Sequence, residues 1–180
     1  MPLVLDADGL NQLPGGLAGL AAAAAPAIVT PHPGEAGRLL GCDAATVEAD
    51  RLAAVRRLAG DGRVVAVLKG ARTLVCDGTL GDDFVAINPT GGPALATGGT
   101  GDVLAGVIGA LVAQGLAPVD AARLGVWVHG DAGDRAGRAF GSRGATAADV
   151  ADQLGPALAA LAAVRRSPAG ARPSHPRRGG

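Results

Sequence analysis

The sequence predicts an α/β fold in which a mostly parallel sheet is flanked by helices. Residues 3–6, 27–30 and 64–69 form apolar runs of strand length, and such runs are typical of parallel strands that are buried on both faces. Longer segments rich in Ala and Leu alternate with these runs over the first two thirds of the chain. This alternation indicates βαβ units, in which a helix connects two parallel strands.

The segment between the second and third runs is predicted to be a helix over residues 46–59. Thr46 is placed to be its N-cap, and Gly60 and Gly62 follow its last turn. A strand, a helix and a further strand therefore follow one another as one βαβ unit.

Beyond the third run, the sequence predicts a hairpin and then helices. Residues 73–77 and 83–87 are short apolar runs separated by a turn rich in Gly and Asp, so we expect two strands at the edge of the same sheet. Residues 88–100 form a loop rich in Gly, Pro and Thr. Helices are expected at residues 102–115, 118–137 and 147–163.

The first apolar run begins at residue 3. A strand that is buried on both faces needs a neighbouring strand on each side and helices over both faces. We therefore expect the chain to be the back portion of a larger fold.

Length and composition describe one domain, expected at residues 1–164. The chain has 180 residues, of which 48% are apolar, but no apolar run approaches the ~20 residues of a membrane span. The N-terminus lacks the regions of a signal peptide, so we expect a cytoplasmic protein without membrane contact. Cys42 and Cys76 predict neither a disulfide framework nor a zinc site, because neither has a partner at ligand spacing.

The last sixteen residues, 165–180, contain five arginines and are expected to form a disordered basic tail. The net charge of the whole chain is zero, so residues 1–164 carry a charge of −5. Aromatic residues make up only 2% of the chain. An acidic domain with few aromatic side chains excludes a nucleic-acid-binding protein, which needs a basic face or stacking side chains.

The segment 88–106 contains the strongest functional signal. Gly99, Thr100 and Gly101 precede a helix expected to begin near Asp102. Backbone amides of such a loop and the positive end of the helix dipole form an anion site. An aspartate there is suited to orient or deprotonate a hydroxyl that attacks a bound phosphate. Alternatively, Asp102 caps its own helix.

Five further candidate residues are expected at or just beyond the carboxyl ends of strands, where open α/β sheets bind ligands. Lys69 is the only lysine of the chain, and it either holds a phosphate or extends its ammonium to solvent. His32 lies between two prolines, either at the site or as a loop residue. Glu35 is either a helix cap or a site residue. Asp6 and Asp8 follow the first strand, and either reach a metal or substrate or bind turn amides.

Five segments together resemble the ADP-dependent NAD(P)H-hydrate dehydratase family of the ribokinase-like superfamily. The motif GGTGD, at residues 98–102, is similar to the anion-hole motif of that superfamily. The other segments occur in the order found in the dehydratases, and the resemblance covers residues 3–160, without the first part of the family's fold. These segments are VLDADGLN at 4–11, TPHPGEAGRLLG at 30–41, VLKGARTLVCDG at 67–78, NPTGGPALATGGTGDVLAGVIGALVAQG at 88–115 and GVWVHGDAGD at 125–134.

The resemblance implies a ribokinase-like α/β fold and assigns roles to individual residues. It implies that His32 and Asp102 bind the hydrated nicotinamide substrate and that Asp102 is catalytic. The anion hole would be formed by Gly99, Thr100 and Gly101. The implied nucleotide-binding residues are Lys69, Gly70, Ala71, Arg72, Thr73 and Gly101. Trp127 and His129 are expected to be packing residues of a helix.

The reaction implied by the resemblance repairs hydrated NADH or NADPH. ADP is the co-substrate and Mg²⁺ the cofactor, with unknown metal ligands. The hydrate's hydroxyl is phosphorylated, and loss of the phosphate restores the double bond. Two other interpretations are a kinase of the thiamin-precursor type and a non-catalytic nucleotide-binding remnant. We also expect a homo-oligomer, since the unpaired first strand would expose a sheet edge.

Overall fold

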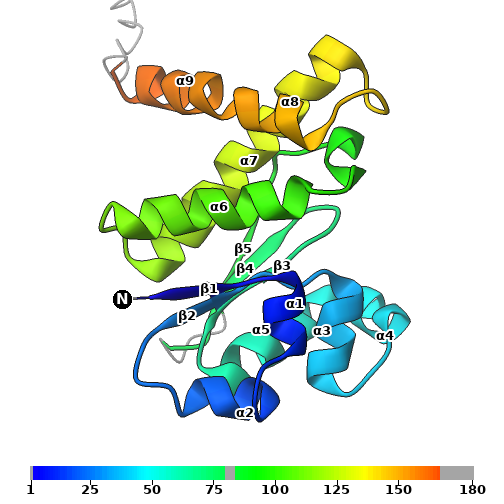
Figure 1. Cartoon of the computed structure of the whole chain (residues 1–180), viewed down its shortest axis with the longest axis vertical. Helices are drawn as coiled ribbons and strands as arrows, with labels where there is room; N and C mark the ends of the chain where they lie inside the picture. The colour runs from blue at the N-terminus through cyan, green and yellow to red at the C-terminus, as the bar shows by residue number, and fades with distance from the viewer. Residues whose placement is uncertain (1, 80–83, 167–180) are drawn as a thin grey trace, which may run out of the picture.

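The computed structural model describes residues 2–79 and 84–166, and it shows a five-stranded sheet with helices on both faces (Figure 1). This arrangement confirms the α/β class that the apolar runs predicted. The strands are β1 (Leu3–Leu5), β2 (Ala27–Val29), β3 (Val65–Leu68), β4 (Leu74–Asp77) and β5 (Val85–Ile87).

The sheet is mixed and has the strand order β1-β2-β3-β4-β5. The first three strands are parallel, with Val4 opposite Ile28 and Ile28 opposite Val65. β4 runs antiparallel to β3 and β5 antiparallel to β4, so the hairpin is confirmed at the edge of the sheet. The carboxyl ends of β1, β2 and β3 therefore meet along one side of the sheet.

Five helices cover one face of the sheet (Figure 1). Alternate strand residues such as Val29, Ala66 and Leu68 point toward this face and pack against Val55 and Leu58. Because the strand side chains alternate, the same strands supply apolar groups to both layers. The helices of this face are α1 (Ala7–Asn11), α2 (Gly16–Ala21), α3 (Pro33–Leu40), α4 (Ala44–Ala49) and α5 (Arg51–Gly62).

The opposite face is covered by α6 (Thr100–Ala113) and α7 (Pro118–Phe140). Ile28, Val65 and Val67 pack there against side chains of both helices, including the fully buried Ile108. The far side of α7 packs in turn against a further layer (Figure 1). That layer comprises the 3₁₀ helix η1 (Pro93–Ala96), α8 (Ala147–Asp152) and α9 (Leu154–Arg166).

The predicted helix over residues 46–59 is wrong in its bounds, because two helices occupy this region. Asp43 caps α4 by accepting a hydrogen bond from the Thr46 amide at 2.8 Å, so Thr46 lies within the helix and is not its N-cap. Asp50 ends α4 in a non-helical conformation and caps α5 through the Ala53 amide. Asp50 is thus a second capping aspartate, and it starts a new helix inside the segment that the sequence predicted to be a single helix.

Other bounds also differ from the prediction. Two short helices, α1 and α2, were not predicted, because five or six residues give too little periodicity. The helix expected at 147–163 is divided into α8 and α9 near Gln153. Since α9 continues to Arg166, the first two residues of the expected tail at 165–180 belong to a helix. Residues 167–180 lie outside the described residues.

β1 lies at the edge of the described sheet, with β2 as its neighbour. The expectation of a strand on each side is therefore not met among the described residues, and Leu3 is 50% exposed. Within the same part of the chain, none of the helices combines the length and apolar character of a membrane span.

Candidate functional site

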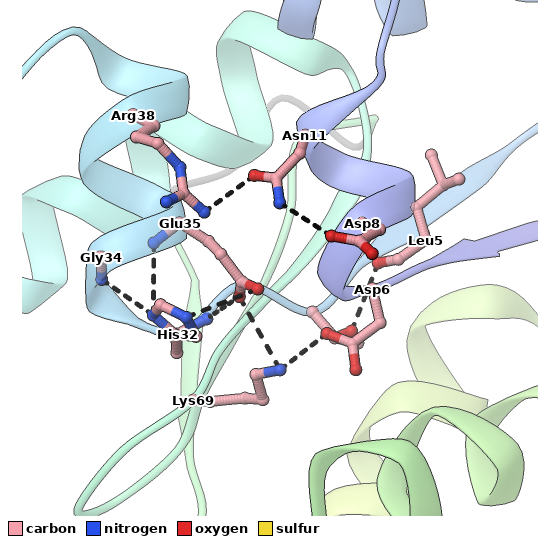
Figure 2. A network of polar contacts seen from close by, with 10 residues as sticks. Leu5, Asp6, Asp8, Asn11, His32, Gly34, Glu35, Arg38 and Lys69 are labelled. Carbon is pink, nitrogen blue, oxygen red and sulfur yellow. Dashed lines mark hydrogen bonds and ion pairs between the residues drawn. The ribbon is translucent and has the colours of Figure 1, made fainter. Parts of the chain in front are cut away.

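Charged residues from three elements meet at the carboxyl side of the parallel strands. Asp6 follows β1, His32 and Glu35 lie at the start of α3 after β2, and Lys69 follows β3. Figure 2 shows their side chains converging around the Lys69 ammonium group. Parallel strands place these groups together because their carboxyl ends share one edge of the sheet.

Lys69 is held by two carboxylates and does not extend freely into solvent. Its Nζ atom lies 2.6 Å from Oδ1 of Asp6 and 3.8 Å from Oε2 of Glu35. The exposed fractions of the side chains of Lys69, Asp6 and Glu35 are 18%, 11% and 6%. A β-carbon at Gly101 would lie 3.3 Å from this Nζ atom. Lys69 therefore connects the ends of β1 and β3 with the first turn of α6.

His32 and Glu35 cap α3 reciprocally. Nδ1 of His32 accepts hydrogen bonds from the amides of Gly34 and Glu35 at 3.0 and 3.2 Å, while the His32 amide donates to Oε2 of Glu35 at 2.7 Å. Glu35 is therefore both a cap and a partner of Lys69. The His32 side chain is 53% exposed, so its outer edge is accessible to a ligand while Nδ1 is occupied.

The two aspartates after β1 have different surroundings. Asp6 pairs with Lys69, whereas Asp8 accepts a hydrogen bond from the Asn11 side chain at 3.3 Å. Asn11 accepts in turn from Arg38 at 2.8 Å, as Figure 2 shows. Of the two candidates, only Asp6 faces the Lys69 cluster.

A cavity of about 450 Å³ lies beside Lys69, between the sheet edge, α6 and α7. All six residues that the resemblance assigns to the nucleotide line it, namely Lys69, Gly70, Ala71, Arg72, Thr73 and Gly101. Thr100 lines it as well, whereas Gly99, Asp102 and His32 are not among the lining residues. Segments 69–73 and 100–101, which are distant in the sequence, thus line the same cavity.

The 69–73 loop is shaped around Gly70, whose φ angle is +137°. The Arg51 guanidinium donates to the carbonyl oxygens of Leu68 and Lys69, both at 3.3 Å. A β-carbon at Gly70 would lie 2.7 Å from Nη1 of Arg51. Both the dihedral angle and the close approach of Arg51 therefore favour glycine at this position.

The glycine loop ends in α6, which begins at Thr100 and not near Asp102. Gly99 is the N-cap in the left-handed conformation, with φ of +86°. The Thr100 hydroxyl lies 2.8 and 2.9 Å from the carbonyl oxygens of Leu95 and Thr97, and its amide donates to Thr97 at 3.4 Å. Thr100 thus stabilises the loop. In the hydrogen bonds of the described residues, the amides of Gly99 and Gly101 have no acceptor within the chain.

Asp102 occupies the third position of α6 and is exposed. The N-cap of this helix is Gly99, so Asp102 is not the cap residue that the alternative interpretation required. Asp102 directly follows Gly101, which lines the cavity.

The loop at residues 88–92 is bonded to α7, a feature that the sequence did not reveal. The Asn88 side chain donates to the Val126 carbonyl at 3.0 Å, and the Thr90 hydroxyl to the Trp127 carbonyl at 2.9 Å. A β-carbon at Gly130 would lie only 2.1 Å from the Thr90 hydroxyl oxygen. In the sequence, the small residues of HGDAG are the feature that could have indicated this close approach.

His129 lines the same cavity from α7, although the sequence predicted a packing residue. The residue is 7% exposed. Burial, together with a smaller effect of the charge of Lys69, lowers the pKa of its imidazole to about 4, although a hydrogen bond with the Thr100 backbone opposes the shift. The ring is therefore neutral near pH 7. Trp127, two residues earlier, is half-buried and packs against the α7–α9 core, as predicted.

Metal-binding groups are few in the described part of the chain. No three side chains among His, Cys, Asp and Glu gather there at ligand distances. Asp6 and Glu35, however, place two carboxylates around the ammonium group of Lys69. Mg²⁺ in phosphate sites commonly takes only one or two carboxylates, together with water and phosphate oxygens.

The fold is that of an α/β protein with charged residues at the ends of its parallel strands, and a helix N-terminus after a glycine loop is typical of sites that bind phosphate groups. A sequence profile of the NAD(P)H-hydrate dehydratase family matches residues 1–165. The chain belongs to this family.

Two curated relatives are similar over most of the chain. The bifunctional NAD(P)H-hydrate repair enzyme of Moorella thermoacetica is 47% identical over 154 residues, which are 86% of this chain and 28% of that protein. The ADP-dependent (S)-NAD(P)H-hydrate dehydratase of Neisseria meningitidis is 47% identical over 135 residues, 74% of this chain and 45% of that protein. The chain thus spans less than half the length of these relatives.

A solved structure agrees with the fold. The ADP/ATP-dependent NAD(P)H-hydrate dehydratase of Bacillus subtilis, co-crystallised with ATP and Mg²⁺, has a TM-score of 0.77 and 30% identity. The match covers 89% of this chain and 55% of that chain. The expected ribokinase-like fold is thereby confirmed.

Proposed function

We propose that this chain binds ADP in the cavity and uses it in the dehydration of hydrated NADH or NADPH. The observation that carries the proposal is that the 69–73 loop and Gly101 line one cavity beside the Lys69 ammonium group. The names of the relatives support the same pair of ligands. Adenine nucleotide is therefore the ligand assigned to this cavity.

The first turn of α6 is suited to hold the terminal phosphate of ADP. The amides of Gly99 and Gly101 are free to donate, and the helix dipole adds positive potential at the same end. Lys69 adds a charge-assisted donor from β3. Donors fixed by the backbone stabilise the charge that develops on a phosphoryl group without reorganising.

Asp102 is the proposed catalytic base. Its exposed carboxylate stands next to Gly101 and lacks a capping role, so it is available to accept the proton of the hydrate's hydroxyl. The hydroxyl oxygen attacks the terminal phosphoryl group of ADP, and AMP leaves. Elimination of the phosphate from the phosphorylated hydrate then restores the double bond. The exposed edge of His32 is the proposed contact for the hydrate.

Mg²⁺ fits this site through Asp6 and Glu35, the two carboxylates that contact Lys69. When bound, the ion would supply positive charge against the phosphate oxygens of ADP. Asp6 and Glu35 would hold it from the sheet side, while Lys69 keeps both carboxylates oriented toward one point.

Asp102→Asn tests the proposal, because asparagine keeps the size of the side chain and removes the base. We expect kcat to fall by at least about 10²-fold, the lower range for loss of a general base, while the Kd of ADP changes by no more than a few-fold. Phosphate release with ADP and the hydrate measures the first quantity, and calorimetry measures the second.

Three outcomes contradict the proposal in different ways. Near wild-type turnover of Asp102→Asn excludes this carboxylate as the base. Nucleotide binding without hydrate-dependent phosphate release favours a binding remnant. Phosphorylation of a thiamin precursor in place of the hydrate favours a small-molecule kinase.

A further inference from the structure

His129 lines the nucleotide cavity and has one ring nitrogen without a hydrogen-bond partner among the described residues. Its imidazole is 7% exposed, and Nε2 is buried without a hydrogen-bond partner among the described residues. Val126, His129 and Gly130 share one face of α7, as their helical spacing requires, and all three line the cavity. A buried polar atom without a partner is costly, so this atom requires an explanation that packing does not supply.

The position of the imidazole is fixed before any ligand arrives. The loop at residues 88–92 donates hydrogen bonds to the carbonyls of Val126 and Trp127, on the turn of α7 before His129. Gly130 contacts Thr90 directly. The ring therefore lies in a rigid wall between this loop and the first turn of α6, and not on a mobile segment.

The chemistry of the ring indicates which kind of ligand group fits. Burial keeps the imidazole neutral near pH 7, and the ring bonds to the Thr100 backbone. Because Nε2 has no partner in the described part of the chain, we assign the bond with the Thr100 backbone to Nδ1, which donates it to the carbonyl as an N–H group. A neutral ring with its proton on Nδ1 offers Nε2 as an acceptor only. Phosphate oxygens are acceptors too, so the partner must be an O–H or N–H group.

We propose that Nε2 of His129 accepts a hydrogen bond from the nucleoside part of the adenine nucleotide. The donors of that part are the ribose hydroxyls and the adenine amino group. His129 is thus a binding residue that recognises the nucleoside, whereas the amides of α6 and Lys69 bind the phosphates. This inference rests on the proposal that the cavity binds ADP.

Two variants of the full 180-residue chain test the role of His129. His129→Leu fills the space without an acceptor, and we expect it to weaken ADP binding by roughly 3- to 10-fold, the range for one net hydrogen bond. His129→Gln retains an acceptor at the end of its side chain, and its Kd should stay within about twofold of wild type. In the absence of nucleotide, the Tm of His129→Leu should change little, because removal of the unpaired nitrogen and loss of the bond with the Thr100 backbone have opposite effects. A packing role predicts a lower Tm with unchanged affinity for ADP.

Analogues identify the donor on the wild-type protein, independently of any variant. If a ribose hydroxyl is the partner, 2′-deoxy-ADP or 3′-deoxy-ADP should bind more weakly than ADP by the same factor. If the amino group is the partner, inosine diphosphate should do so instead. The weakened analogue should then show no further loss with His129→Leu. Equal affinity of wild type and His129→Leu for ADP, or no loss with any analogue, overturns the inference. If the wild-type chain binds no ADP, the proposed function falls as well.

Discussion

Two neighbouring carboxylates offset the positive charge of Lys69, so this residue does not give the site a net positive charge. One ammonium group faces the carboxylates of Asp6 and Glu35, so the three groups together carry a charge of −1. An anionic ligand at this point needs the amides of α6 and a metal ion in addition to the lysine. The ion pair therefore orients Lys69, and it also explains why the cluster suits Mg²⁺.

Lys69→Met should lower both the affinity for nucleotide and the stability of the folded protein. The lost charge should reduce ADP affinity by about 1.5–3 kcal/mol, the range for a charge-assisted hydrogen bond. Because Asp6 and Glu35 are largely buried, we also expect a loss of about 1–3 kcal/mol in the free energy of unfolding. Calorimetry and urea unfolding measure the two effects.

The double variant Asp6→Asn/Lys69→Met is the control for Lys69→Met. It removes one uncompensated carboxylate, so it should recover part of the stability and none of the affinity. If Lys69→Met has wild-type stability, the ion pair with Asp6 contributes nothing to folding.

His129 predicts a specific acid sensitivity. Its pKa is about 4 in the folded protein and about 6.5 when unfolded, so the unfolded state binds more protons between these values. Stability is then complete above pH 6.5 and falls as the pH decreases toward 4, by about 3 kcal/mol in total. Urea unfolding at pH 7 and pH 4.5 should show a smaller difference for His129→Gln than for wild type. An equal difference would mean that His129 titrates normally.

At the scale of elements, the contact between α7 and the loop at residues 88–92 holds the cavity open. The loop is bonded to α7 through Asn88 and Thr90, and the Gly91 amide donates to Asp134 at 3.0 Å. Gly130 provides the space for this approach. The length of α7, 23 residues, allows it to pack on the sheet at one end and on α8 and α9 at the other.

Gly130→Ala should displace the loop at residues 88–92, since its methyl group would overlap the Thr90 hydroxyl oxygen at 2.1 Å and the Thr90 carbonyl carbon at 2.8 Å. We expect a loss of about 1–3 kcal/mol in stability, typical of overpacking, together with weaker ADP binding. Gly109→Ala on α6 is the matched control. No atom lies within 4 Å of the added group, so it should stabilise the helix by about 0.5–1 kcal/mol. Thermal unfolding should give a lower Tm for Gly130→Ala and a higher Tm for Gly109→Ala than for wild type.

At the scale of the whole molecule, the described sheet has two exposed edges. Leu3 on β1 is 50% exposed and Ile87 on β5 is 56% exposed. An edge with unpaired backbone groups and apolar side chains favours pairing with another chain. The expected homo-oligomer is therefore a prediction that this surface supports.

Leu3→Lys should reduce self-association, because a charged residue on an edge strand opposes pairing. Light scattering over a range of protein concentrations should give a lower mean mass for this variant than for wild type. Leu158→Lys is the control, since Leu158 is also exposed, at 43%, but lies on α9. A wild-type chain that is monomeric at all concentrations contradicts the prediction.

The sequence by itself determined the local features. Apolar runs bounded by polar residues predicted the five strands, because an unpaired charge is costly within a buried strand. The glycine loop before α6 was visible because only certain residues permit its dihedral angles. The segments 69–73 and 98–102 were predicted to be functional through their motifs.

Only the tertiary structure decided which side chains meet. The sequence left open whether Lys69 reaches solvent, and the parallel order of β1, β2 and β3 brought Asp6 and Glu35 to it. His129 was predicted to be a packing residue, since its spacing on α7 does not reveal what its face contacts. The contacts of Lys69 and His129 depend on groups that are 29 to 63 positions away in the chain, and local patterns carry no information about such distances.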